Sequence, residues 1–324
     1  MKRIMNLTTN DMDLERYSDN EDLKNAYRQF GLDGLELMDA GEDVDTIVRP
    51  DDVLGVHLKY FYHWLSLWEE DADAILTEYG TWDVCREVFG GTGREAVIES
   101  YRRNLDFAKK YNPEYAVFHV CDVTIGDSVT RDFKYTDIQV IDAVIDLVNT
   151  VFTENSAGFT LLFENLWWTG LTMEKPELLE RLLSKVKYPK LGVMLDIGHL
   201  LHTNRSIRSL DDGIDYIYRL LDRYDNLDFI KGIHLHQTLS GEYVNSVLKN
   251  PFPVSGDYYE RLTSVFGHLM KIDSHKPFIS DRIPALVERI APEYLVFEYI
   301  TSSREEYEGY LRDQLRCFDK AIIR

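Results

Sequence analysis

A carboxylate and an imidazole stand three residues apart at the end of a strongly apolar run. Residues 191–195 have the length of a strand, and Asp196, Gly198 and His199 follow them. A buried charge without a partner costs free energy, so an aspartate at the end of such a run is expected to interact with a specific group rather than to pack in the core. Gly198 permits a sharp turn that brings His199 back beside Asp196. A carboxylate with an imidazole suits a divalent metal ion, so this Asp-x-x-His step is a candidate pair of metal ligands.

The charge of the chain bears on what such a site could act upon. The 324 residues carry 36 Lys and Arg against 56 Asp and Glu, a net charge of −20. This field repels a phosphate backbone, whose binding depends on cationic side chains displacing counterions. We therefore expect no nucleic-acid partner. The hydrophobic content of 44% is ample for a large core.

The cysteines and the N-terminal residues bear on the compartment. Three cysteines, odd in number and far apart, imply no disulfide framework; they are Cys85, Cys121 and Cys317. The first residues lack the long apolar run of a secretory signal, and no stretch has the length and apolarity of a membrane span. We expect a soluble cytoplasmic protein without a membrane partner.

Short apolar runs alternate with helix-period segments along the chain. Eight runs are predicted strands: 4–8, 33–38, 53–59, 115–121, 159–166, 190–197, 229–236 and 294–300. Helices are predicted over 20–30, 94–110, 136–152, 176–186, 209–224, 281–290 and 303–321, with a helical segment near 257–271 in an insertion. Strands that alternate with helices imply parallel strands with helical crossovers. The pattern predicts an α/β fold, a (β/α)₈ TIM barrel, with residues 1–324 as one domain.

Residues 60–92 interrupt this rhythm. They are rich in tryptophan, tyrosine and phenylalanine, and Gly90-Gly91-Thr92-Gly93 follows the aromatic part. We interpret the segment as a long loop. A loop of this length within a compact domain is usually functional and often a lid.

Polar residues recur where the predicted strands end. Each of the last six strands carries a histidine, glutamate or aspartate near its C-terminal end: His57, His119, Glu164, Asp196, His234 and Glu298. Active sites of barrels lie at that end. One such residue is commonly structural, but the carboxylates of six equivalent positions would repel one another without a cation. We predict a metal centre for a divalent ion such as zinc, manganese or cobalt.

Short motifs at these strand ends carry a family resemblance. They are Gly34-Leu35-Glu36-Leu37, Val56-His57-Leu58, Phe163-Glu164-Asn165, the turn from Asp196 to His199, Gly232-Ile233-His234-Leu235 and Val296-Phe297-Glu298. Together they resemble the xylose isomerase-like TIM barrels, which include endonuclease IV and many sugar isomerases and epimerases. The resemblance covers nearly the whole chain. It implies that one metal is held by Glu164, Asp196, His234 and Glu298, and that Glu164 and Glu298 also act as a paired acid and base.

Endonuclease IV is similar at five further positions, where it builds a three-metal site for phosphodiester cleavage. Here these positions are His57, His119, His199, Asp273 and His275. The nine residues together could hold one to three ions. Two departures weaken the comparison with the nuclease, because the stretch between His234 and Asp273 is long and the chain is strongly acidic.

The favoured hypothesis is a metal-dependent isomerase or epimerase of a small sugar, polyol or sugar phosphate. The metal would polarise the carbonyl and hydroxyl oxygens while Glu164 and Glu298 move a proton at the adjacent carbon. One alternative is a phosphoesterase with two or three metals acting on a small substrate; another is a non-catalytic binding protein.

Four other residues are candidates for substrate contact: His236, Lys59, Trp167 and Glu36, the last also a candidate for orienting a metal ligand. Aromatic rings near the barrel mouth would suit the apolar faces of a carbohydrate-like substrate. His63, His202 and His268 give no usable signal.

Overall fold

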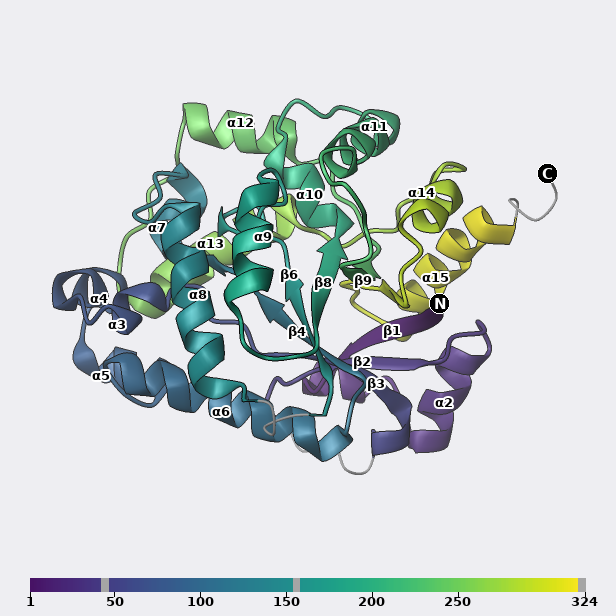
Figure 1. Ribbon diagram of the computed structural model, residues 1–324, viewed down its shortest axis with the longest axis horizontal. Coiled ribbons are helices and arrows are strands. Elements are labelled where there is room, and N and C mark those ends of the chain that lie inside the picture. Colours follow the sequence, from purple (N-terminus) through teal and green to yellow (C-terminus); the bar gives the residue numbers. More distant parts are fainter. Residues whose placement is uncertain (42–46, 154–157, 320–324) are drawn as a thin grey trace.

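The computed structural model describes residues 1–41, 47–153 and 158–319. Eight parallel strands close into a barrel in the order β1, β10, β9, β8, β6, β4, β3, β2 (Figure 1). Their bounds are β1 Lys2–Thr8, β2 Gly34–Met38, β3 Val53–His57, β4 Tyr115–His119, β6 Thr160–Glu164, β8 Leu191–Asp196, β9 Ile230–His234 and β10 Tyr294–Phe297. Each of the eight predicted strands corresponds to one of these, so the predicted TIM barrel is confirmed.

Helices surround the barrel, and all of them except the last, α15, lie between successive barrel strands in the sequence. They are α2 Asn20–Arg28, α6 Arg94–Tyr111, α8 Asp137–Val151, α9 Pro176–Lys185, α11 Leu210–Leu221, α14 Ile283–Ile290 and α15 Arg304–Asp319. Local signals start several of them: a Thr136–Gln139 capping box begins α8, and Pro176 is the first residue of α9. The last residues of the predicted helix 303–321 lie outside the described part of the chain. No helix among the described residues is long and apolar enough to cross a membrane.

Apolar side chains fill the space inside the barrel below the strand ends. This inner layer consists of Ile4, Tyr115, Val117, Leu162, Met194, Tyr294 and Val296. A larger apolar layer lies between the strands and the surrounding helices. The strands therefore bury both faces, which accounts for their nearly continuous apolar sequences. The polar side chains at the C-terminal ends of the strands lie above this inner layer, and Glu36 in the middle of β2 contacts the layer through Tyr115.

The interpretation of residues 60–92 as a long loop is wrong. This segment forms three short helices, α3 Leu65–Trp68, α4 Ala72–Tyr79 and α5 Trp82–Phe89. Asp71 caps α4 and Thr81 caps α5, each accepting a hydrogen bond from a backbone N–H three residues on. The three helices are only four, eight and eight residues long, and all four residues of α3 are buried, so the segment shows little helical period.

The described structure contains several further elements. A two-stranded antiparallel sheet joins β5 Cys121–Asp122 to β7 Thr169–Gly170. The remaining helices are α1 Asp11–Leu14, α7 Ile125–Thr130, α10 Ile197–Thr203, α12 Gly241–Lys249 and α13 Tyr258–Ile272, with a 3₁₀ turn over Pro50–Asp52. The helices α12 and α13 form the insertion that follows β9, and α13 corresponds to the predicted segment 257–271.

Gly55 on β3 lies against the ring of Tyr115, and a Cβ at this position would be 2.1 Å from Tyr115 Cζ. The ring cannot easily move, because its hydroxyl donates to Glu36 at 2.7 Å and Tyr294 packs against it. We predict that Gly55→Ala lowers the free energy of unfolding by about 1–3 kcal/mol, the usual cost of an overpacked core. Denaturant unfolding measures this change.

Gly309 provides the matched control, since a Cβ there meets nothing within 4 Å and the residue lies inside α15. Gly309→Ala should stabilise the protein by about 0.5–1 kcal/mol. A Gly55→Ala variant as stable as the wild type would show that the inner layer is looser than described.

Candidate metal centre

The strand ends bring the six predicted polar side chains together. Five of the six are the last residues of β3, β4, β6, β8 and β9, and Glu298 directly follows β10. The register explains their common level: His119 is paired with Glu164, and Asp196 with His234. All six side chains enter the barrel mouth above the inner apolar layer.

The inner group is formed by Glu164, Asp196, His234 and Glu298. His234 Nδ1 lies 3.6 Å from a Glu164 oxygen, 3.6 Å from an Asp196 oxygen and 3.3 Å from Glu298 Oε2. Ligands about 2.0–2.1 Å from a tetrahedral metal are separated by about 3.3 Å. His234 Nδ1 and Glu298 Oε2 are buried without a hydrogen-bond partner within the described structure. Two buried polar atoms of this kind, facing each other, fit a cation between them.

Glu36 holds the His234 ring in this orientation. Its Oε1 accepts a hydrogen bond from His234 Nε2 at 3.0 Å, and its Oε2 accepts one from Tyr115 Oη at 2.7 Å. Because the proton is on Nε2, the lone pair of Nδ1 is directed toward the carboxylates. The structure thus places Glu36 behind a candidate ligand rather than at the mouth.

A second group consists of His57, His119 and Glu164. Both imidazoles direct Nε2 at Glu164 Oε2, His57 at 3.2 Å and His119 at 3.1 Å. The other nitrogen of His57 donates to the carbonyl of Leu58 at 3.0 Å, which leaves Nε2 free to act as a ligand. Glu164 therefore belongs to both the inner and the second group, and it is completely buried.

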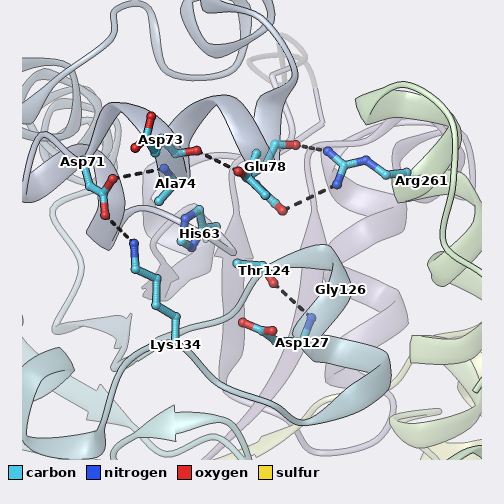
Figure 2. Close-up of a pocket in the computed structure, with 11 residues that line it drawn as sticks. His63, Asp71, Asp73, Ala74, Glu78, Thr124, Gly126, Asp127, Lys134 and Arg261 are labelled. Atoms are coloured by element: carbon cyan, nitrogen blue, oxygen red, sulfur yellow. Dashed lines mark hydrogen bonds and ion pairs between the residues drawn. The ribbon is translucent and has the colours of Figure 1, made fainter.

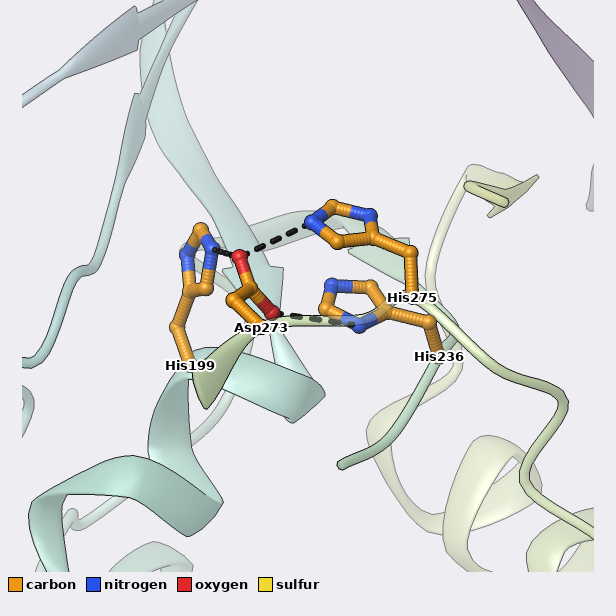
Figure 3. A group of neighbouring side chains, drawn as sticks. All are labelled: His199, His236, Asp273 and His275. Carbon is orange, nitrogen blue, oxygen red and sulfur yellow. Dashed lines mark hydrogen bonds and ion pairs between the residues drawn. The ribbon is translucent and has the colours of Figure 1, made fainter. Parts of the chain in front are cut away.

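The third group lies at the rim and contains His199, Asp273 and His275, with His236 beside them (Figure 3). Asp273 Oδ2 is 3.1 Å from His199 Nε2 and 2.9 Å from His275 Nε2. The opposite ring nitrogens of these histidines contact the backbone carbonyls of Asn165 and Glu298, at 2.9 and 3.2 Å. These contacts fix the tautomers with both Nε2 lone pairs toward Asp273.

The step from Asp196 to His199 is a helix start. Asp196 is the N-cap of α10, and its side chain accepts a hydrogen bond from the backbone N–H of His199 at 2.6 Å. The proposed role of Gly198 in a sharp turn is wrong, because Gly198 lies within the first turn of α10. A Cβ there would be 2.1 Å from the ring of His236, so glycine is required by close packing.

Three of the residues predicted to contact substrate do not line the open mouth of the barrel. His236 is buried, and its Nε2 donates to Asp196 Oδ2 at 2.8 Å. Trp167 is also buried, and its ring packs against His199 and His202 with centroid distances of 4.9 Å in both cases. Lys59 is exposed and lines a separate cavity together with several aromatic residues.

Sequence reasoning missed His202. Its Nε2 donates to Asp273 Oδ1 at 3.2 Å, and its Nδ1 contacts Ser240 Oγ at 3.0 Å. This contact occupies Oδ1 and leaves Oδ2 of Asp273 for His199 and His275. The available signal was the spacing, because His202 follows His199 by one turn of α10.

The carboxylates and imidazoles perturb one another strongly. Burial raises the pKa of Glu164, but His119 and His234 together lower it well below the usual range. Burial likewise opposes ionisation of Asp273, yet His275 and His199 depress its pKa. In contrast, burial lowers the pKa of His275, and Asp273 and Glu298 then raise it to about 9. The negative charge of the site therefore demands either protonated histidines or metal ions.

A second buried polar chain lies away from the metal centre. His63 Nδ1 contacts Asp122 at 3.0 Å, and its Nε2 contacts Ser66 Oγ at 2.7 Å. Ser66 is completely buried, and Asp122 also accepts the backbone N–H groups of Trp64 and Leu65. These contacts anchor α3 and give Ser66 no access to a substrate, so we interpret the chain as structural.

The stability gained from metal should depend on pH. In metal-free protein, the pKa of His275 is raised from 6.5 in the unfolded chain to about 9 in the folded protein. Protonated His275 therefore contributes to the free energy of unfolding fully below pH 6.5, and this contribution is lost as the pH rises through about 9. Metal binding needs deprotonated imidazoles, so it becomes more favourable over the same range. We predict that the increase in Tm caused by Mn²⁺ is larger at pH 9 than at pH 6.5, as measured by thermal unfolding.

The variant Asp196→Ala is the control, because it removes a ligand of the inner group without removing a histidine. It should reduce the Mn²⁺-induced increase in Tm at both pH values. An increase in the wild type that is constant or shrinks with rising pH would contradict the assignment of these histidines as ligands.

Comparisons with known proteins bear on the family and the fold of the chain. The family model described as xylose isomerase-like TIM barrel matches residues 25–284. A protein named probable endonuclease 4, from Halothermothrix orenii, is 29% identical over 188 residues. The match covers 57% of this chain and 63% of that protein, so the chain spans less than two thirds of this relative's length.

Two solved structures share the fold. A candidate xylose isomerase from Rhodospirillum rubrum superposes with a TM-score of 0.56 at 12% identity, covering 98% of this chain and 99% of that one. The IOLI protein with a bound zinc atom gives 0.50 at 11% identity, covering 98% and 96%. Because the family model spans well over half of the sequence, the chain belongs to the xylose isomerase-like TIM barrel family.

Proposed function

We propose that the protein is a metal-dependent hydrolase of a small phosphoester. The observation that carries this proposal is the connection of the three groups through shared residues. Glu164 belongs to both the inner and the second group, and Glu164 Oε1 lies 3.1 Å from His199 Nδ1 of the rim group. All nine residues that the resemblance assigns to a three-metal site thus lie in one continuous cluster.

The position of Glu164 favours hydrolysis over the isomerase hypothesis that the sequence favoured. An acid or base for a carbon-bound proton needs an oxygen that faces the substrate. Glu164 is completely buried, with Oε2 facing His57 and His119 and Oε1 facing His199. A carboxylate surrounded in this way suits a bridge between neighbouring cations better than proton transfer at carbon.

The donor sets fit divalent ions, which would be held by Glu164, Asp196, His234 and Glu298 in the inner group, by His57, His119 and Glu164 in the second, and by His199, Asp273 and His275 at the rim. Bound there, such ions would supply Lewis-acid stabilisation of the phosphoryl oxygens and a deprotonated water. The protein's own contribution is to hold these side chains rigid. Asn165 serves this purpose, since its amide pairs with both the N–H and the carbonyl of Asp196, at 2.9 and 3.0 Å.

Only a few members of the cluster reach solvent. The most exposed side chains are His119 at 13%, Asp273 at 12%, and His275 and Glu298 at 10% each. A substrate would therefore approach between the second group and the rim group. This narrow opening and the net charge of −20 favour a small phosphoester over a nucleic acid.

An isomerase or epimerase of a small sugar is the second candidate. It is supported by Glu298, whose Oε2 has no hydrogen-bond partner in the described structure and whose side chain reaches the mouth. The inner group alone would suffice for this chemistry, with the other two groups as supporting structure.

The two candidates differ in the bond that breaks. We predict that protein loaded with Mn²⁺ or Zn²⁺ hydrolyses small phosphoesters. Glu164→Gln should lower kcat/KM by at least about 100-fold, which exceeds the usual 10–100-fold loss for a residue that only supports a metal ligand. Cleavage is measured as release of p-nitrophenol from p-nitrophenyl phosphate and bis-p-nitrophenyl phosphate, and as release of phosphate from a panel of sugar phosphates in D₂O.

Glu114→Gln is the matched control, because Glu114 precedes β4 at the opposite end of the barrel, where it pairs with Lys2. It should leave the rate unchanged. Deuterium incorporation at a substrate carbon without ester cleavage would overturn the hydrolase proposal and establish the isomerase.

A further inference from the structure

His236 lies inside the cluster but is not among the nine residues that the resemblance assigns to metal. Its side chain is completely buried, and its Nε2 lies 2.8 Å from Asp196 Oδ2 and 3.5 Å from Glu298 Oε2. The same two oxygens lie 3.6 and 3.3 Å from His234 Nδ1. Two carboxylate oxygens and two imidazole nitrogens thus alternate in a closed ring of contacts. Separations near about 3.3 Å are those of ligands around a single ion.

The ring of His236 is held in position by two close neighbours. A Cβ on Gly198 would be 2.1 Å from His236 Cε1, so only glycine leaves room for the ring at this point of α10. The ring of His275 is stacked on that of His236, with a centroid distance of 3.8 Å and an angle of 7° between the planes (Figure 3). A side chain packed in this way presents its nitrogen to the carboxylates before an ion binds.

The stacking with His275 decides which ion His236 can hold. The lone pair of an imidazole nitrogen lies in the plane of the ring. Two parallel rings stacked one above the other therefore cannot both direct a lone pair at the same ion. His275 Nε2 faces Asp273 at the rim, so an ion of the rim group excludes His236, although the side chains lie close together. The nitrogen of His236 that remains for ligation is Nε2, which faces the inner group.

Ligation through Nε2 requires the proton of His236 on Nδ1. Without an ion, the proton on Nε2 forms the hydrogen bond to Asp196. Nδ1 is buried without a hydrogen-bond partner in the described structure, and Asp273 Oδ1 lies 3.8 Å from it. Histidines that bind metals commonly donate their other N–H to a carboxylate. The surroundings of Nδ1 therefore suit the tautomer that ligation needs.

We propose that His236 is a fifth protein ligand of the inner ion and binds it through Nε2. The ion is then held by Glu164, Asp196, His234, His236 and Glu298. Zinc sites are mostly four-coordinate, whereas Mn²⁺ accepts octahedral coordination, so three carboxylates and two imidazoles favour Mn²⁺ at this position. The inference rests on the metal centre of the proposed function but not on the bond that the protein breaks.

A cavity lined by parts of α4, α7 and α13 is a weaker candidate for a further site (Figure 2). It has a volume of about 570 Å³ and is lined by His63 and by several charged side chains. Lys134 is paired with Asp71 at 2.5 Å, and Arg261 is paired with Glu78. Charges that already neutralise each other offer little to a charged ligand.

A crystal structure of the protein reloaded with Mn²⁺ tests the proposal without any substitution. His236 Nε2 should lie within about 2.5 Å of the inner ion, a metal–nitrogen bonding distance. The proposal is overturned if an ion occupies the inner group while Nε2 keeps its hydrogen bond to Asp196; the proposed function then still stands. An inner group that binds no ion would remove the metal centre on which both depend.

Two substitutions separate ligation from hydrogen bonding. His236→Gln keeps an N–H donor for Asp196 but removes the imidazole lone pair, whereas His236→Ala removes both. Each variant should weaken Mn²⁺ binding at the inner group by at least about 100-fold, which exceeds the usual 10–100-fold loss for a residue that only supports a ligand. Titration followed by the electron paramagnetic resonance signal of free Mn²⁺ gives the affinity, and anomalous peaks identify the site.

His268→Gln is the matched control. His268 is also buried and contacts Tyr243 Oη and the carbonyl of Ser128 through its two ring nitrogens, but it belongs to none of the three groups. This substitution should leave the affinity for Mn²⁺ unchanged. A His236→Gln variant that binds Mn²⁺ as tightly as the wild type would show that His236 only supports Asp196, and the proposal would then be wrong.

Discussion

The burial of carboxylates at the barrel mouth is the constraint on which the rest of the structure depends. Glu36, Glu164 and Asp196 are almost completely removed from solvent, and Glu298 and Asp273 lie close to them. Charges of one sign cannot share a low-dielectric site unless cations compensate them. Imidazoles surround these carboxylates, yet His234 Nδ1 and Glu298 Oε2 remain without hydrogen bonds within the described structure. The negative charge of the site therefore has to be compensated by protonated histidines or, as we propose, by bound metal ions.

The barrel meets this constraint through the register of its strands and through glycines at two tightly packed positions. Parallel strands place their last residues at one level, so that one polar residue per strand is enough to assemble the centre. Gly55 makes room for Tyr115, which supports Glu36 and through it His234. Gly198 makes room for the His236 ring against α10. The apolar layer below keeps water away from the floor of the site.

Much of this organisation could be predicted from the sequence. The apolar runs ended in polar residues, and that pattern indicated both the strands and the positions of His57, His119, Glu164, Asp196 and His234. The spacing of Asp196 and His199 added His199, and the resemblance to a known family added Asp273 and His275; none of these three rim residues lies on a strand. Their convergence could not follow from strand period alone.

Other features depend on packing that no local pattern reports. His202 donates a hydrogen bond to Asp273 and contacts Ser240, two residues far from it in the sequence. These contacts could not be predicted without the position of α10 relative to the insertion. His236 was a candidate for substrate contact, but β9 ends at His234 and His236 is completely buried beside Asp196. The helices within residues 60–92 were hidden because they are short and because α3 is buried on every side.

The number and positions of bound ions test the central claim most directly. Crystals of protein reloaded with Zn²⁺ or Mn²⁺ should give anomalous difference peaks at the inner group, at the second group beside Glu164, and at the rim between His199, Asp273 and His275. At least two of these peaks, with Glu164 between them, would support a multinuclear hydrolase. A single peak at the inner group, with His57 and His275 directed into packing contacts, would contradict the account.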